Sequence, residues 1–307
     1  MNGENPYAPF GKINPVAFVF ISLLIVFLTY QIIGSIILLV FLGYSTDISV
    51  SNVGLVRIII TFSQFLLIFF PVILLNALRG WDFRETFFIK KPDVKIFFLA
   101  VAGIVVIQPF LQLFMYLQNL LIFSIPFGQE ILEKIKLIFD TFEKSTLSLV
   151  TSYSIPEFLV VILAIALTPA ICEEFLFRGL IFKNFNKSLS LKASVFYTGL
   201  IFALFHFHPF NLLPLILLGV YLTFVVYYSE SIFTSVVCHF INNFISAYVV
   251  FIFGYDITSS ENMKPDEINQ LIISGIISLI IFVLILYFIV KVFKKNKQKN
   301  IISVGNG

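Results

Sequence analysis

Two adjacent carboxylates and a guanidinium lie within an apolar stretch of this 307-residue chain. Glu173, Glu174 and Arg178 follow the almost wholly apolar residues 158–167 and precede the apolar residues 180–182. A charge at membrane depth costs at least about 2.5–3.5 kcal/mol, so such side chains are candidates for function. Glu174 and Arg178 are four residues apart and face each other on a helix, which predicts an ion pair. Glu173 is turned by about 100° and lacks such a partner, so it is free to face a cavity.

Two histidines occupy other apolar stretches of the chain. His206 follows Phe202 by four residues and Asn243 follows His239 by four, so each pair shares one helical face. A carboxylate and an imidazole can together deprotonate water, while a second imidazole and a carboxamide can stabilise an oxyanion. Alternatively, Glu173, His206 and His239 bind a catalytic metal such as Zn²⁺. Both routes are hydrolytic, and the remaining alternative is that these polar groups only pack against one another.

A proline and two cysteines adjoin these groups. Pro169 lies four residues before Glu173, where it removes one helical N–H and frees the carbonyl of Ile165. This predicts a kink beside the carboxylate. Cys172 and Cys238 each directly precede a candidate catalytic residue, which raises the alternative of a thiol nucleophile. A thiol in apolar surroundings is usually an inert packing residue, so we expect both cysteines to be structural.

The composition indicates a helical membrane protein. Hydrophobic residues make up 59% of the chain and charged residues 12%, and the mean hydropathy is +1.01. These values exclude an ordinary soluble domain. Only helices and closed barrels satisfy the backbone in lipid, and these apolar runs are too long for barrel strands. We therefore predict one all-α, polytopic membrane domain over residues 1–307, with its active-site cavity inside the membrane.

Eight apolar stretches are candidate membrane spans. They are residues 15–42, 55–78, 96–123, 158–182, 193–207, 212–228, 232–253 and 271–292. The fifth and sixth are short for a bilayer. They either tilt little, are shielded by protein, or form a re-entrant pair around His208 and Pro209. The spans between 158 and 253 carry the polar motifs and are predicted to form the catalytic core.

The lysines and arginines predict how the chain is oriented. With eight spans, the basic segments 79–95, 183–192 and 291–299 fall on one side, which positive-inside statistics identify as cytoplasmic. Both termini are then cytoplasmic, with 293–307 as a basic cytoplasmic tail, and we expect a multi-pass protein of the cell membrane. The loops 44–52, 124–157 and 256–267 fall on the outer side.

The long outer segment 124–157 contains an apolar helical stripe. Its members are Ile131, Ile135, Ile138, Phe139 and Phe142. This pattern predicts an amphipathic helix lying in the membrane interface. A loop helix packed on the bundle is the alternative.

The three polar motifs resemble those of the CPBP intramembrane metalloprotease family. This family, also called CAAX proteases or Abi, includes bacteriocin-processing enzymes and is related to the type II CAAX prenyl endopeptidase. The motifs are Glu173-Glu-x-x-x-Arg178, Phe202-x-x-x-His206 and His239-x-x-x-Asn243. They occur in order over about residues 162–248, and the first half of the chain shows no such resemblance.

The resemblance implies an eight-helix membrane peptidase. In it, Glu173 and His206 would activate the water, while His239 and Asn243 would stabilise the oxyanion. The ion pair predicted above would hold the site together, and the phenylalanine of the second motif would shape it. The expected partners are the lipid bilayer and a peptide or protein substrate at the membrane, and no feature indicates nucleic acid. No feature selects prenylated proteins or peptide precursors as substrates.

Two other functional classes remain open. A proton- or ion-coupled transporter would use the glutamate and the histidines as a relay. Matching broken helices in two halves of the chain, as inverted repeats give, are not visible in the sequence. A non-catalytic membrane immunity or binding protein would keep the same cavity for contact with a partner.

Overall fold

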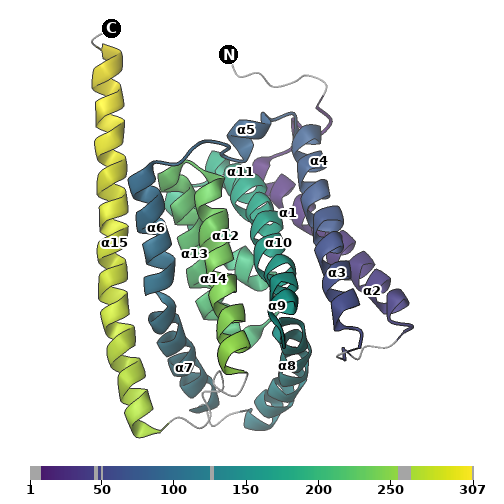
Figure 1. The fold of residues 1–307 in the computed structure, drawn as a ribbon. Helices are drawn as coiled ribbons and strands as arrows, with labels where there is room; N and C mark the ends of the chain where they lie inside the picture. The colour runs from purple at the N-terminus through teal and green to yellow at the C-terminus, as the bar shows by residue number, and fades with distance from the viewer. Residues whose placement is uncertain (1–7, 45–47, 50, 125–127, 255–263, 306–307) are drawn as a thin grey trace.

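The computed structural model describes residues 8–44, 48–49, 51–124, 128–254 and 264–305. Within these ranges the chain forms helices and turns and no strand, and the helices pack as one bundle (Figure 1). Seven helical stretches of the described chain are long and apolar enough to cross a membrane. The prediction of an all-α, polytopic helical bundle is confirmed.

The first four spans are built from consecutive segments. They are α1 (Pro15–Val26), η1 (Phe27–Gly34) and α2 (Ser35–Phe41); α3 (Val53–Gln64), η2 (Phe65–Phe69) and α4 (Phe70–Arg79); α6 (Val94–Val106) and α7 (Gln108–Ser124); and α9 (Ile155–Val161), η3 (Ile162–Leu167), α10 (Thr168–Glu174), η4 (Phe175–Ile181) and α11 (Phe182–Ser188). The other three are η5 (Pro209–Asn211) with α13 (Leu212–Ser229), then α14 (Ile232–Phe253), then α15 (Pro265–Gly305).

The predicted fifth span is short, as expected. It is α12 (Leu191–Leu204), whose 14 residues extend about 21 Å, less than a bilayer core. The chain turns at residues 205–211, where Phe207 has a positive φ of 50°. α12 and α13 form a closely packed pair, because Gly199 and Gly219 lie so close that a Cβ on either would meet the other helix's backbone at 2.6–2.8 Å. Among the eight predicted spans, α12 is the one that is too short to cross a bilayer.

The basic segments lie at one end of the bundle. Figure 1 shows α5 (Phe83–Thr86), α11 and the C-terminal end of α15 at the same end. The lysine-rich residues from 293 continue α15 as far as Gly305, so the predicted tail extends the last helix. Which side of a membrane this end faces stays a prediction. Most of the predicted outer loop 256–267 lies outside the described residues.

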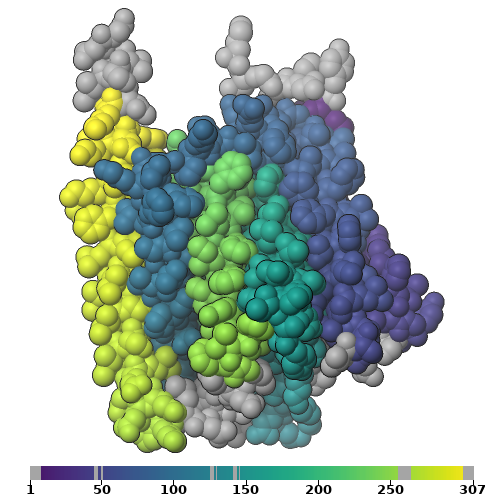
Figure 2. Space-filling model, in the orientation of Figure 1, coloured from purple at the N-terminus to yellow at the C-terminus, as the bar shows by residue number. Residues whose placement is uncertain are grey.

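Lipid-facing surfaces of the bundle are apolar. Figure 2 shows α15, α6 and α14 side by side across one face. Large hydrophobic side chains on the outside of α15 are exposed, among them Ile273, Ile276, Ile280 and Val283. Exposed apolar side chains of this kind are expected on helices that are surrounded by lipid.

The predicted amphipathic helix is present as α8 (Gln129–Val150). It lies at the end of the bundle opposite the basic segments (Figure 1) and packs against α3 and α14. Ile131 and Ile138 of the predicted apolar stripe are exposed, while Ile135 and Phe139 are half-buried. The side chain of Phe142 lies outside the described part of the chain. Contact of the exposed side chains with the membrane interface stays a prediction.

A buried arginine that the sequence patterns did not reveal fastens the end of α8. Arg57 of α3 is only 1% exposed. It donates hydrogen bonds to the carbonyl of Leu149 at 2.9 Å and to that of Thr151, and it pairs with Glu157 at 2.9 Å. Because the last carbonyls of a helix have no partner within the helix, Arg57 satisfies groups that would otherwise be orphaned.

We expect Arg57→Met to lower the free energy of unfolding by about 2–3 kcal/mol. Removing one partner of a buried ion pair costs about 3–5 kcal/mol, and the partial exposure of Glu157 reduces that cost. Thermal unfolding in detergent, with Arg84→Met on the exposed surface of α5 as control, measures the effect. Equal melting temperatures for the two variants would show that Arg57 does not hold α8.

Candidate active site

Glu174 and Arg178 form the ion pair that their spacing predicts. Arg178 Nη1 lies 2.5 Å from Glu174 Oε1, and both side chains are fully buried. Arg178 also donates to the carbonyl of Gly219 at 3.2 Å, and its guanidinium carbon lies 4.5 Å from the ring centre of Phe202. The pair therefore links the fourth span to α12 and α13. Its position between three helices agrees with a role in holding the site together.

The same carboxylate orients His239. His239 Nδ1 donates to Glu174 Oε1 at 2.8 Å, and Ser235, one turn earlier on α14, donates to Glu174 Oε2. Since Nδ1 is engaged, Nε2 is the nitrogen of this ring that remains for other contacts. Glu174 thus accepts from an arginine, a histidine and a serine, which fixes the imidazole in one orientation.

The candidate residues line one cavity of about 310 Å³ between the helices. Its polar lining consists of Gln64, Glu173, His206, His239, Asn242, Asn243 and Ser246. Its lining also includes Val150 at the end of α8 and none of the residues in the basic segments. The cavity therefore reaches toward the end of the bundle that carries α8. Glu174 and Arg178 lie behind its wall, fully buried.

Glu173 and His206 face each other across this cavity. His206 Nε2 lies 4.0 Å from Glu173 Oε2, and their side chains are 32% and 20% exposed. His206 is in the turn just beyond α12, so it is not on the helix as its spacing from Phe202 predicts. Its Nδ1 nevertheless donates to the carbonyl of Phe202 at 2.8 Å, which leaves Nε2 as an acceptor. The Oε2 atom of Glu173 is itself buried, and it has no hydrogen-bond partner among the described groups.

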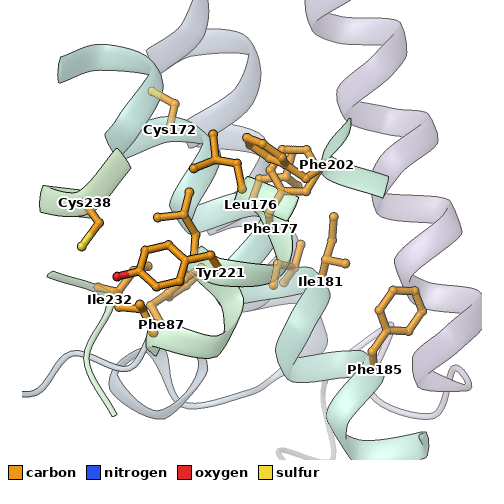
Figure 3. Packing of buried hydrophobic residues seen from close by; sticks show 14 of the residues in the cluster. Phe87, Cys172, Leu176, Phe177, Ile181, Phe185, Phe202, Tyr221, Ile232 and Cys238 are labelled. Atoms are coloured by element: carbon orange, nitrogen blue, oxygen red, sulfur yellow. The ribbon is translucent and has the colours of Figure 1, made fainter. Parts of the chain in front are cut away.

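Phe202 separates the two histidines. Its buried ring lies 4.6 Å from that of His206 and 5.8 Å from that of His239, centre to centre. Figure 3 shows it packed beside Leu176 and Phe177 in the hydrophobic core. A ring held on all sides in this way fixes how far apart the imidazoles can lie.

A row of side-chain amides orients Asn243. Gln108 of α7 donates to Asn242 Oδ1 at 3.1 Å, and Asn242 Nδ2 donates to Asn243 Oδ1 at 3.2 Å. Asn243 Nδ2 then donates to the carbonyl of Ile165 at 3.4 Å. This is the carbonyl that Pro169 was predicted to free. Because its oxygen is occupied, Asn243 presents its NH₂ group, a hydrogen-bond donor, to the cavity.

Four π-helical segments surround the site, and the sequence patterns did not predict them. η3 and η4 flank Glu173 and Glu174, while η1 and η2 lie in the first two spans. η3 ends at Leu167, two residues before Pro169, in the stretch where the sequence predicts a kink. Wide helical turns of this kind are rare and frequently occur at functional sites, where they redirect side chains.

The predicted metal ligands do not converge on one point. Among the described residues, no group of three or more His, Cys, Asp or Glu side chains could hold a metal ion. One nitrogen of each ring is engaged, His239 by Glu174 and His206 by a backbone carbonyl, as is also usual for metal-binding histidines. Because the three side chains do not form a group that could hold a metal, the set of Glu173, His206 and His239 does not fit Zn²⁺ as arranged here, and no step below is routed through a metal.

Both cysteines are fully buried in the hydrophobic core (Figure 3). Cys172 and Cys238 line none of the cavities described here. Their surroundings are those of packing residues, as expected. The thiol alternative gains no support from this arrangement.

Comparison with known proteins identifies the part of the chain that contains the motifs. The family model described as type II CAAX prenyl endopeptidase Rce1-like matches residues 155–245. No curated protein and no solved structure matches the chain significantly. The matched family is a protease family, which supports peptidase activity. With the seven apolar helices, the match indicates an integral membrane protein. Residues 155–245 thus carry an Rce1-like domain, consistent with the CPBP/CAAX protease family that the three motifs predicted.

Proposed function

We propose that the protein is an intramembrane endopeptidase that hydrolyses peptide bonds of membrane-associated peptides or protein tails. The observation that carries this proposal is the single cavity lined by Glu173, His206, His239 and Asn243. Glu173 and His206 each present a hydrogen-bond acceptor to the space between them. His239 and Asn243 can each present a hydrogen-bond donor. Amide hydrolysis needs such a set, because the water must lose a proton while the carbonyl oxygen gains negative charge.

Glu173 and His206 activate the water. Glu173 Oε2 and His206 Nε2 are both acceptors and lie 4.0 Å apart, so one water molecule can donate to both. As the water oxygen attacks the carbonyl carbon, its proton passes to Glu173. The carboxylate is held inside an apolar bundle, where its hydrogen bonds are stronger than in bulk water.

His239 and Asn243 stabilise the tetrahedral oxyanion. Asn243 donates through its NH₂ group, and His239, whose Nδ1 donates to Glu174, donates through Nε2 when that nitrogen carries a proton. When the C–N bond breaks, Glu173 returns the proton to the departing amine. The products are a carboxylic acid and an amine, which exchange a proton at neutral pH to give a carboxylate and an ammonium, so atoms and charges balance.

Cleavage of a library of membrane-associated peptides by the protein in lipid nanodiscs tests this proposal. In H₂¹⁸O, hydrolysis places ¹⁸O in each new C-terminal carboxylate, which mass spectrometry detects. We expect the wild type and Glu85→Gln, an exposed control on α5, to cleave and Glu173→Gln not to. A chelator arm tests the metal alternative separately. Cleavage that persists in Glu173→Gln, or no cleavage by folded wild type, would overturn the proposal.

A further inference from the structure

Gln64 lines the same cavity and carries a buried hydrogen-bond acceptor without a partner among the described groups. It is the last residue of α3, directly before the π-helical segment η2, and it is 6% exposed. It lines the cavity together with Glu173 and His206. Its Oε1 is buried and has no hydrogen-bond partner among the described groups. Leaving a buried polar atom unpaired costs about 1–3 kcal/mol, so such an atom at a cavity wall points to a ligand.

Tyr30 lies beside this amide. Its hydroxyl interacts with the Gln64 side chain, and since Oε1 has no hydrogen-bond partner among the described groups, the NH₂ group is the part that faces Tyr30. Tyr30 belongs to η1 and lines a second small cavity of about 60 Å³ with Glu173 and His206. Gln64 keeps one further N–H and its oxygen, and the oxygen is the atom that lacks a partner among the described groups.

The other polar groups of the cavity, Ser246 apart, already have uses. Glu173 and His206 accept from water in the proposed reaction, and Asn243 and His239 donate to the oxyanion. The side-chain oxygens of Asn242 and Asn243 are both occupied by neighbouring amides. A peptide brings N–H donors as well as a carbonyl, and none of these groups receives them.

We propose that Gln64 Oε1 accepts a hydrogen bond from a backbone N–H of the substrate beside the scissile bond. This inference rests on the proposed function and narrows its substrate class. The substrate is a chain bound through its main chain, with an unsubstituted secondary amide at one defined position. An ester or an N-alkylated residue there is a poorer substrate. Gln64 is a positioning residue that lies outside the matched segment 155–245.

The test pairs a protein substitution with a substrate substitution. Gln64→Met keeps the side-chain length and removes the acceptor, and Gln112→Met on the exposed face of α7 is the matched control. A peptide that the wild type cleaves is resynthesised with each backbone N–H near the scissile bond replaced in turn by an ester oxygen. The value of kcat/KM is measured for every combination, with melting temperatures to confirm folding.

We expect the ester to lower kcat/KM of the wild type and of Gln112→Met about tenfold at one position only. Gln64→Met should cleave the parent peptide about tenfold less well and lose nothing further with that ester. If the losses from Gln64→Met and from the ester multiply, or if Gln64→Met leaves kcat/KM unchanged, the inference about Gln64 is wrong and the proposed function still holds. Absence of Glu173-dependent cleavage would overturn the proposed function with it. Should Gln64→Met fail to fold, wild-type insensitivity to every ester would still refute the inference.

Discussion

Arg178→Ala is expected to prevent normal accumulation of the protein or to lower its melting temperature sharply. Removing one partner of a buried ion pair costs about 3–5 kcal/mol, because it leaves an uncompensated charge. Here Glu174 is fully buried, and the lost guanidinium is one of its three hydrogen-bond donors. A loss of this size is a large fraction of the stability of a typical domain. Abundance in membranes and thermal unfolding in detergent measure it.

Two companion variants separate the charge effect from lost packing. Arg84→Ala removes an exposed arginine of α5 and should leave stability within about 0.5 kcal/mol of the wild type. Glu174→Leu combined with Arg178→Met removes both charges and should be more stable than Arg178→Ala alone. Arg178 also contacts Gly219 and Phe202, so part of the loss should persist in the double variant. A melting temperature of Arg178→Ala equal to that of the wild type would contradict the structural role of the pair.

The spacing of residues in the sequence predicted those features of the site that depend on a single helix. The Glu174–Arg178 pair is an i,i+4 contact, and rules for helical faces suffice to find it. Pro169 frees a carbonyl four residues earlier, and the structure gives that carbonyl to Asn243. The bundle itself follows from the length of the apolar runs. The order of the motifs indicated a family resemblance over about residues 162–248, and the family model matches residues 155–245.

Contacts between distant segments could not be predicted in this way. Arg57 pairs with Glu157 across 100 positions, and no periodicity connects them. Gln64 and Gln108 are isolated amides in apolar helices, and only the fold brings Gln64 to the cavity and Gln108 to Asn242. The role of Ser235 could have been predicted from the sequence, because Ser235 lies one helical turn before His239 on the same face. The prediction that His206 lies on a helix was wrong, because it lies in the turn after α12. This turn nevertheless keeps His206 in contact with Phe202, four residues earlier.

Glu173→Gln and His206→Ala are each expected to lower kcat by about 10²–10⁴-fold, the usual contribution of general acid–base catalysis. Glutamine retains the shape of glutamate but cannot take the proton from water. Loss of the imidazole removes the second acceptor, 4.0 Å away, that orients the same water. Stability of Glu173→Gln should be unchanged or higher, because the buried oxygen that it replaces has no partner among the described groups. Steady-state kinetics and thermal unfolding in nanodiscs measure both quantities.

The double variant distinguishes a shared water from two separate roles. Residues that act as a unit show strongly non-additive effects, so Glu173→Gln combined with His206→Ala should be scarcely slower than the worse single variant. His208→Ala is the matched control, because His208 lines a neighbouring cavity with His206 but does not line that of Glu173. It should leave kcat within a few-fold of the wild type. Losses that multiply in the double variant would mean that the two side chains act in different steps, and His206 would then be sought among the groups that bind substrate.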